Sequence, residues 1–250
     1  MKQKLKYYYH RLKGYPKVYP DDVFIVSYPK SGNTWTRFVL GHLLTNCERQ
    51  LKFPDLKNIA PEYESNQEEL NSLTAPRLIK SHAVYTRYFP KVIYLIRDPR
   101  DVYVSYYFYY KKKLNNKQTI TDFIEDKGLR QGVNWGDHVK AWENHPNILF
   151  IRYEDLLTEP GTYFGKMLDF TPQFQWDKSL LDQAIAYSSF DSLRKVENEY
   201  GLAGKDKKFL DGTKFVRSGK AGDWKNHLNQ EDIQIITVRE GNIMHQQGYL

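Results

Sequence analysis

The chain has few of the features that mark secreted or membrane proteins. Its 250 residues include a single cysteine, Cys47, so no intrachain disulfide can form, which fits a reducing compartment. No stretch approaches the roughly 20 apolar residues that a bilayer span requires. The first residues also lack the apolar core of a secretory signal. We therefore expect a cytoplasmic protein that does not bind a membrane.

Motifs for several common chemistries are missing as well. The sequence has no H-E-x-x-H or H-x₃-H pattern and no pair of cysteines, so we predict no metal site. It has no G-x-S-x-G elbow, which argues against a serine hydrolase. There is neither an internal repeat nor a low-complexity segment. At this length we expect residues 1–250 to form one α/β domain.

The charge of the chain is positive. Its 37 Lys and Arg outnumber its 30 Asp and Glu, for a net charge of +7 and a pI near 9.1. Such a balance suits binding to nucleic acid, to a membrane surface, or to a strongly anionic small ligand. The densest basic stretches, residues 2–13 and 111–113, are interpreted as solvated surface. Twenty tyrosines suit a pocket that stacks rings, although they are also common in cores.

The most informative segment is residues 28–35, with the sequence YPKSGNTW. It lies between an apolar run at 23–26 and a segment with apolar helical periodicity, an order that predicts strand, tight loop and helix. Such a loop points backbone N–H groups at an anion, usually a phosphate. Lys30 adds a positive charge there. Because this lysine precedes the glycine, the loop differs from the G-x-x-x-x-G-K-[ST] nucleotide loop, and we predict a phosphate site of another lineage.

Strands alternate with helices along the rest of the chain. This order predicts an α/β fold with a central, mostly parallel sheet flanked by helices on both faces. We interpret 51–75 as an irregular connection with one short helix at 67–73, 111–118 as a polar loop, and 201–222 as a long functional loop. The other predicted strands are 77–80, 91–96 and 148–151, and the other predicted helices are 99–110, 120–126, 135–143, 154–157, 163–168, 179–187, 190–198 and 230–246.

Each predicted strand is followed by a side chain with useful chemistry: Lys30, His82, Arg97 and Tyr153. Ligands of parallel sheets bind outside the carboxyl ends of the strands, so we expect these residues at one edge. His82 is a candidate general base or a structural histidine. Arg97 is a candidate phosphate ligand or part of an Arg–Asp pair that caps the next helix.

A second glycine-rich basic segment, FVRSGKAGDW, occupies residues 215–224. It has the composition of a flap that closes over a phosphate or of a flexible surface loop. Composition alone leaves both open.

Three motifs together resemble a known family. Residues 28–35, residues 97–105 (RDPRDVYVS) and residues 217–224 (RSGKAGDW) are similar, in order and spacing, to motifs of the cytosolic-type sulfotransferases, which use 3′-phosphoadenosine-5′-phosphosulfate (PAPS). The resemblance covers about residues 20–245. It implies the P-loop-nucleoside-triphosphatase-like sulfotransferase fold and transfer of a sulfuryl group from PAPS to a hydroxyl or amine of a small-molecule acceptor. The product would be the bisphosphate PAP, and neither a metal nor a nucleic acid is implied.

The resemblance also implies roles for individual residues. His82 would be the general base, and Lys30 would stabilise the leaving phosphate at the bridging oxygen. Lys80 would stabilise the transferring group, and Ser105 would hold Lys30 away from the donor until acceptor binds. The residues implied to bind PAPS are Lys30, Ser31, Gly32, Asn33 and Thr34 at the 5′-phosphosulfate, Trp35, Tyr153, Ser188 and Phe190 at the adenine, and Arg97, Ser105, Arg217, Ser218 and Gly219 at the 3′-phosphate.

The chain also departs from the family pattern. Asn33 stands where threonine is frequent, and Ser218 stands where a second basic residue is usual. The dimer motif K-x-x-x-T-V-x-x-x-E is broken at Asn229, Gln230 and Gln234, so a monomer and a dimer both remain open. Trimmed loops fit a bacterial or specialised-metabolism enzyme.

The acceptor site and two other functions are also left open by the sequence. We expect the acceptor pocket to be lined by aromatic residues, namely Tyr85, Tyr88, Phe89, Tyr107, Phe108 and Trp135. The alternatives are a nucleotide-dependent phosphoryl transferase and a non-catalytic protein that binds PAP or RNA.

Overall fold

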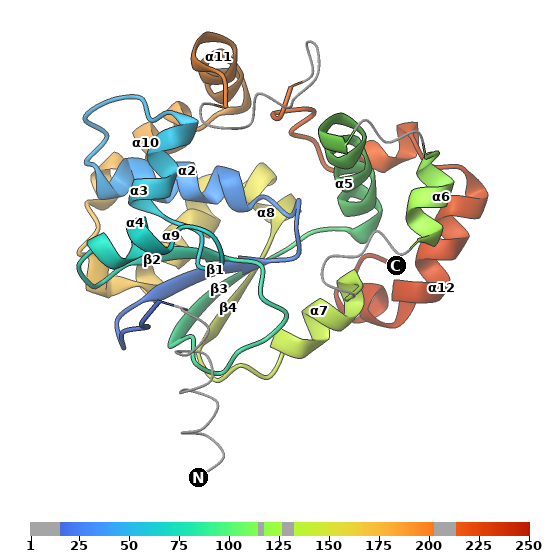
Figure 1. Ribbon diagram of the computed structural model, residues 1–250, viewed down its shortest axis with the longest axis horizontal. Helices are drawn as coiled ribbons and strands as arrows, with labels where there is room; N and C mark the ends of the chain where they lie inside the picture. The colour runs from blue at the N-terminus through green and yellow to red at the C-terminus, as the bar shows by residue number, and fades with distance from the viewer. Residues whose placement is uncertain (1–15, 115–117, 127–132, 203–213) are drawn as a thin grey trace.

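A four-stranded parallel sheet forms the centre of the molecule (Figure 1). The structure is a computed structural model and describes residues 16–114, 118–126, 133–202 and 214–250. The strands are β1 (Val23–Ser27), β2 (Leu78–Ser81), β3 (Lys91–Ile96) and β4 (Ile148–Arg152), in the spatial order β2-β1-β3-β4. The predicted α/β fold with a parallel central sheet is confirmed.

Helices connect the strands and cover both faces of the sheet. Within the described residues, no helix is both long enough and apolar enough to cross a bilayer. The helices are α2 (Asn33–Leu44), α3 (Leu56–Ile59), α4 (Gln67–Ser72), α5 (Pro99–Leu114), α6 (Ile120–Glu125), α7 (Trp135–Trp142), α8 (Tyr153–Thr158), α9 (Pro160–Phe170), α10 (Leu181–Tyr187), α11 (Phe190–Tyr200) and α12 (Gln230–Gln246), with 3₁₀ turns η1 (Phe53–Asp55), η2 (Pro172–Phe174), η3 (Lys178–Leu180) and η4 (Asp223–Asn226).

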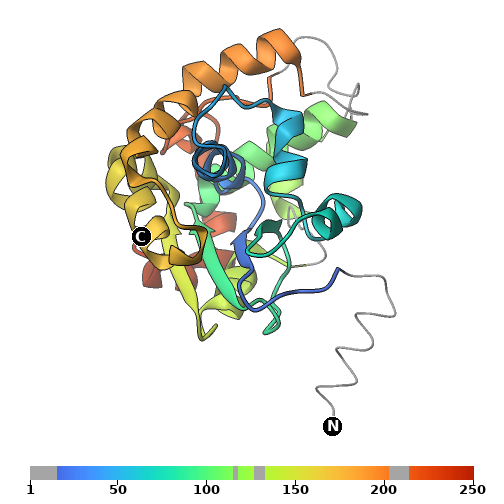
Figure 2. The ribbon, with the colours of Figure 1, turned by 90° about the vertical axis from the view of Figure 1, so that its left-hand side faces the viewer.

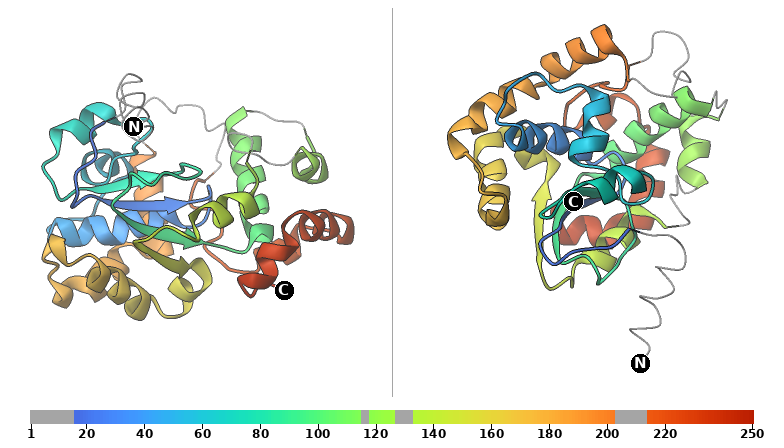
Figure 3. Two further views of the ribbon diagram at one scale, coloured as in Figure 1. Left: turned by 90° about the horizontal axis from the view of Figure 1, so that it is seen from below. Right: turned by 60° about the vertical axis from the view of Figure 1, so that its left-hand side comes forward.

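The two faces of the sheet carry separate cores because side chains alternate along a strand. From β1, Phe24 and Val26 pack with α5, α6, α7 and α12, whereas Val23 and Ile25 pack with α2, α9 and α10. Figure 3 shows α2, α9 and α10 on one side of the sheet and α4 and α5 away from them. A strand buried on both faces needs apolar residues at every position, and all five residues of β1 are buried.

The register of the sheet brings the carboxyl ends of the strands together. Ser27 of β1 lies beside Leu95 of β3, and Ile96 of β3 lies beside Arg152 of β4. The loops after the strands therefore begin at nearly the same level. In Figures 1 and 2, α11 lies across the top of the molecule, above the sheet.

Two local predictions were wrong. The predicted polar loop at 111–118 is helical as far as Leu114. Lysine is a good helix former, and the Lys111 ammonium donates to the Tyr107 hydroxyl one turn earlier (3.0 Å). The connection at 51–75 also contains η1 and α3, which sequence periodicity could not reveal because a helix of four residues makes only one turn. The basic stretch at 2–13, the side chains of Lys112 and Lys113, and the middle of the predicted loop at 201–222 lie outside the described residues.

Candidate functional site

A cavity of about 750 Å³ opens at the carboxyl edge of the sheet. The residues that follow all four strands line it, together with α5, α11 and residues 215–219. Every residue that the sequence resemblance assigned to catalysis or to PAPS binding, except Ser31, takes part. These are Lys30, Gly32, Asn33, Thr34, Trp35, Lys80, His82, Arg97, Ser105, Tyr153, Ser188, Phe190, Arg217, Ser218 and Gly219.

The loop between β1 and α2 has the geometry of an anion-binding turn. Lys30 and Gly32 both adopt positive φ, 74° and 97°. A Cβ on Gly32 would lie 2.6 Å from Tyr153 Cδ2, so only glycine fits. Helix α2 begins at Asn33 and has no acidic residue in its first turn. Its unpaired N–H groups and positive dipole end therefore favour a negative ligand.

Several buried polar atoms beside the cavity lack a partner within the described residues: Ser31 Oγ, Ser188 Oγ and Arg97 Nε. A buried polar atom without a hydrogen bond costs about 1–3 kcal/mol. All three atoms are able to donate a hydrogen bond. The site therefore fits a ligand rich in acceptor oxygens, as a nucleotide with several phosphate oxygens is.

The Lys30 ammonium lies against two aromatic rings. It is 4.8 Å from the centroid of Tyr109 and 4.5 Å from that of Phe215. These are cation–π distances. The two rings come from α5 and from the segment 215–224, so the lysine is held between the two walls of the cavity.

His82 is positioned by the neighbouring strand. Its Nδ1 lies 2.7 Å from the carbonyl oxygen of Ser27, the last residue of β1. A carbonyl only accepts, so Nδ1 carries the proton and Nε2 holds the lone pair. The residue is 8% exposed. The arrangement fixes the tautomer that a general base at Nε2 requires.

Lys80 lies on β2, two residues before His82, and forms an ion pair. Its ammonium lies 2.7 Å from Glu62 Oε1. Burial lowers the pKa of Lys80, while the nearby Glu62 carboxylate opposes that shift. Lys80 therefore faces the cavity as one half of an ion pair.

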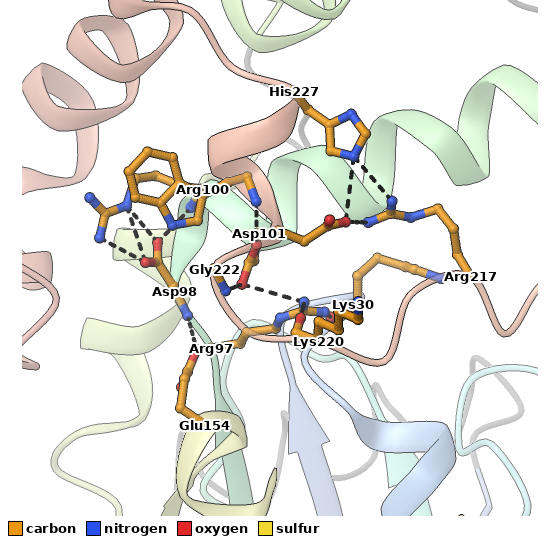
Figure 4. Close-up of polar contacts among 12 residues, drawn as sticks. Lys30, Arg97, Asp98, Arg100, Asp101, Glu154, Arg217, Lys220, Gly222 and His227 are labelled. Atoms are coloured by element: carbon orange, nitrogen blue, oxygen red, sulfur yellow. Dashed lines mark hydrogen bonds and ion pairs between the residues drawn. The ribbon is translucent and has the colours of Figure 1, made fainter. Parts of the chain in front are cut away.

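Arg97 joins the phosphate loop to the segment 215–224 (Figure 4). It donates to the carbonyl oxygens of Lys30 (3.2 Å) and Lys220 (2.9 Å). Its guanidinium lies over the Tyr153 ring, 4.4 Å from the centroid. These contacts hold a positive charge at the cavity wall.

Two Arg–Asp pairs form at the start of α5. Asp98 accepts from the backbone N–H of Arg100 (2.9 Å) at the start of α5, and its carboxylate pairs with the Arg100 guanidinium (2.7 Å). Arg97 itself lies 3.5 Å from the Asp101 carboxylate and also lines the cavity. Arg217 pairs with Asp223 (2.7 Å) and also lines the cavity.

Asp101 holds the segment 215–224 in place. Its buried carboxylate accepts from the backbone N–H groups of Gly222 (2.7 Å) and Trp224 (2.9 Å). Figure 4 shows this anchor next to Arg97.

Gly219 of the same segment, at φ 64°, lies against Phe190, where an added Cβ would be 2.5 Å from Cδ2.

Replacing Asp101 with asparagine should loosen this anchor. The amide offers one acceptor oxygen for two N–H groups, so one charge-assisted hydrogen bond, about 1.5–3 kcal/mol, is lost. We expect binding of an adenosine bisphosphate to weaken about tenfold or more. Isothermal titration calorimetry measures the change. Asp21→Asn, at an exposed position, is the control, and equal affinity in both variants would rule out the anchoring role.

The aromatic residues expected to line the acceptor pocket are not found at this cavity. None of the six lines this cavity, and Phe89 and Trp135 are buried in the core. Tyr107 and Phe108 project from α5 towards Phe123 and His227 instead. The helical period places different tyrosines of α5 on the wall. The lining residues that the sequence reading missed are Pro29, Glu62, Glu64, Ser65, Tyr106, Tyr109, Tyr110, Leu157, Leu193, Phe215 and Val216.

No group of three or more His, Cys, Asp or Glu side chains that could hold a metal ion occurs in the part of the chain that the structure describes.

Comparison with known proteins identifies the family. The sulfotransferase domain model matches residues 20–247. The chain is 30% identical to sulfotransferase 1 family member D1 of Mus musculus over 233 residues, 84% of this chain and 78% of the relative. It is 32% identical to mouse sulfotransferase 2B1 over 228 residues, 83% of this chain and 67% of the relative. The chain belongs to the sulfotransferase family.

Solved structures share the fold. A mouse sulfotransferase complexed with PAP matches with a TM-score of 0.70 at 24% identity, covering 94% of this chain and 90% of that one. Retinol dehydratase in a complex with retinol and PAP matches with a TM-score of 0.69 at 23% identity, covering 91% and 82%. The predicted sulfotransferase fold is confirmed.

Proposed function

We propose that this chain, as one domain, transfers a sulfuryl group from PAPS to a small-molecule acceptor. The observation that carries the proposal is the convergence, at one cavity, of a phosphate-type loop, a histidine with a fixed tautomer, and unpaired buried donors. Membership of the sulfotransferase family and the PAP in related structures support it. No single one of these features would define the reaction.

The residues at the cavity fit the parts of the donor. The loop from Ser31 to Thr34 and the start of α2 would hold the 5′-phosphate. Trp35 and Phe190 would enclose the adenine, with Tyr153 and Ser188 beside it. The 3′-phosphate would be bound by Arg97, Ser105, Arg217, Ser218 and Gly219, all of which line the cavity.

The protein's part in the reaction is to position groups and to neutralise charge. PAPS supplies the sulfuryl group. His82 Nε2 takes the proton of the acceptor hydroxyl or amine while the oxygen or nitrogen of that group bonds to sulfur. The bond from sulfur to the phosphate oxygen breaks, and Lys30 stabilises the negative charge left on that oxygen. Lys80 stabilises the transferring group, and Ser105 restrains Lys30 before the acceptor binds.

A binding test separates this function from the two alternatives. Thermal unfolding would be followed with PAP, ATP and a short single-stranded RNA. A ligand at a hundred times its Kd stabilises the folded state by about 2.7 kcal/mol. We expect PAP to raise the Tm clearly above the values with ATP and RNA, and labelled PAPS to give a sulfated acceptor. A larger shift with ATP would favour a phosphoryl transferase, and PAP or RNA binding without transfer would favour a binding protein.

A further inference from the structure

The pairing of β3 with β4 stops just before the residues that reach the cavity. The last paired residues are Ile96 and Arg152. Beyond them the two segments turn away into α5 and α8, which begin at Pro99 and Tyr153. The backbone carbonyls of a helix point along its own axis, so those of α8 no longer accept from the neighbouring strand. The backbone N–H of Asp98, which follows β3, therefore needs another acceptor.

The side chain of Glu154 supplies that acceptor. Its Oε1 accepts from the backbone N–H of Asp98 (3.0 Å), which belongs to the peptide unit that joins Arg97 to Asp98. Figure 4 shows Glu154 directed at this N–H group. The preceding residue, Tyr153, makes a second contact, since the Arg97 guanidinium lies over its ring at 4.4 Å. Two successive residues after β4 thus hold two successive residues after β3.

The second oxygen of this carboxylate is also occupied. Glu154 Oε2 accepts from the Tyr249 hydroxyl (3.1 Å). Tyr249 is itself fixed, because its carbonyl oxygen accepts from the Arg100 guanidinium (2.8 Å) and the Arg152 guanidinium lies over its ring at 4.4 Å. Glu154 is not among the described residues that line the cavity, so it acts on a ligand only through the residues that it holds.

The most important of these residues is Arg97. It is buried, lines the cavity, and has an Nε without a hydrogen-bond partner among the residues that the structure describes. Burial raises the pKa of Glu154, and the hydrogen bonds to its carboxylate and the charge of Arg97 oppose that shift. The carboxylate therefore lies within electrostatic range of the arginine, and the peptide unit that it fixes decides where the guanidinium points.

We propose that Glu154 is a positioning residue for donor specificity. By bracing the residues after β3 against those after β4, it holds Arg97 at the distance from the adenine that a 3′-phosphate requires. It thereby sets the preference for adenine nucleotides with a 3′-phosphate over those without one. The proposal rests on the proposed sulfotransferase function, in which Arg97 binds the 3′-phosphate and Tyr153 lies beside the adenine.

The binding of PAP and of adenosine 5′-monophosphate (AMP) tests the proposal. AMP keeps the adenine and the 5′-phosphate but lacks the 3′-phosphate, so the Kd for AMP divided by the Kd for PAP reports on the 3′-phosphate alone. In Glu154→Ala, which removes both hydrogen bonds, we expect this ratio to fall by about tenfold, the equivalent of one charge-assisted hydrogen bond. The affinity for AMP should not change. Isothermal titration calorimetry measures both constants.

Two further variants separate positioning from a general loss of stability. Glu154→Gln keeps an oxygen for the Asp98 N–H and presents an amide to the Tyr249 hydroxyl, so it should restore the wild-type ratio. Tyr249→Phe removes the donor to Oε2 and should lower the ratio by a smaller factor than Glu154→Ala. It tests the same brace if the alanine variant does not fold. Glu231→Ala, at an exposed position in the first turn of α12, is the control and should keep the wild-type ratio.

The outcomes separate this proposal from the proposed function. A wild-type protein that prefers PAP to AMP, with the same ratio in Glu154→Ala or, should that variant not fold, in Tyr249→Phe, would overturn the role of Glu154 alone. An equal loss of affinity for both nucleotides would also overturn it, because that result would indicate a structural role. Failure of the wild type to bind PAP, together with no transfer from labelled PAPS, would overturn the sulfotransferase function and the role of Glu154 with it.

Discussion

Replacing His82 with alanine should lower kcat by about 10²–10⁴-fold, the usual contribution of a general base. Nε2 is the nitrogen that the Ser27 carbonyl leaves with a lone pair, since Nδ1 lies 2.7 Å from that oxygen. Without it, the acceptor hydroxyl keeps its proton while it attacks sulfur. The rate is measured in single turnovers with labelled PAPS, so that product release does not mask the chemical step.

The affinity for PAP should be nearly the same in His82→Ala as in the wild type. The imidazole is proposed to act on the acceptor, and the groups proposed for the phosphates lie on other loops. His245→Ala is a matched control, because His245 is exposed near the end of α12. Wild-type turnover in His82→Ala would remove the base assignment, whereas a loss of PAP affinity equal to the loss of rate would point to a structural role.

Many residues that line the cavity could be predicted because they directly follow the strands. Val23–Ser27 and Lys91–Ile96 are short, buried and nearly all apolar, so the sequence locates them well. Once the strands are parallel, the residues after them must meet at one edge. Lys30, His82 and Arg97 could thus be placed together from residues far apart in the chain.

The acceptor wall could not be predicted in the same way. Helix α5 carries a run of aromatic residues with tyrosine or phenylalanine at five successive positions, 106–110. Its hydrophobic periodicity is therefore weak, and composition cannot say which ring faces the cavity. The tertiary contacts decide: Tyr107 packs on Phe123 of α6, whereas Tyr109 contacts Lys30.

The contacts of two carboxylates, Asp101 and Glu64, could not be predicted from the sequence for a different reason. Asp101 could be assigned only a general structural role, because its partners, the N–H groups of Gly222 and Trp224, are more than a hundred residues away. Glu64 lies in the segment 51–75, which was predicted only as an irregular connection. Its contact with the His82 backbone depends on how that connection crosses the end of β2, which no local pattern encodes.

Replacing Lys30 with methionine should lower kcat by about 10²–10³-fold, the effect of removing one group that stabilises developing charge. Methionine keeps an unbranched apolar side chain, which can still pack against the rings of Tyr109 and Phe215 that now flank the ammonium at 4.8 Å and 4.5 Å. The variant loses the positive charge that stabilises the negative charge developing on the oxygen of the leaving phosphate. The loss should appear in the chemical step, measured by rapid quench at saturating PAPS.

Acceptors of different reactivity sharpen the Lys30 prediction. Because the lysine acts on the leaving oxygen, Lys30→Met should reduce the rate for every acceptor by a similar factor. Lys140→Met, at an exposed position of α7, controls for the general loss of a positive charge and should retain full activity. If Lys30→Met kept the wild-type rate in the chemical step, charge neutralisation at the phosphate loop would have to come from Arg97 or from the N–H groups of α2, and Lys30 would be left with a packing role between the two walls.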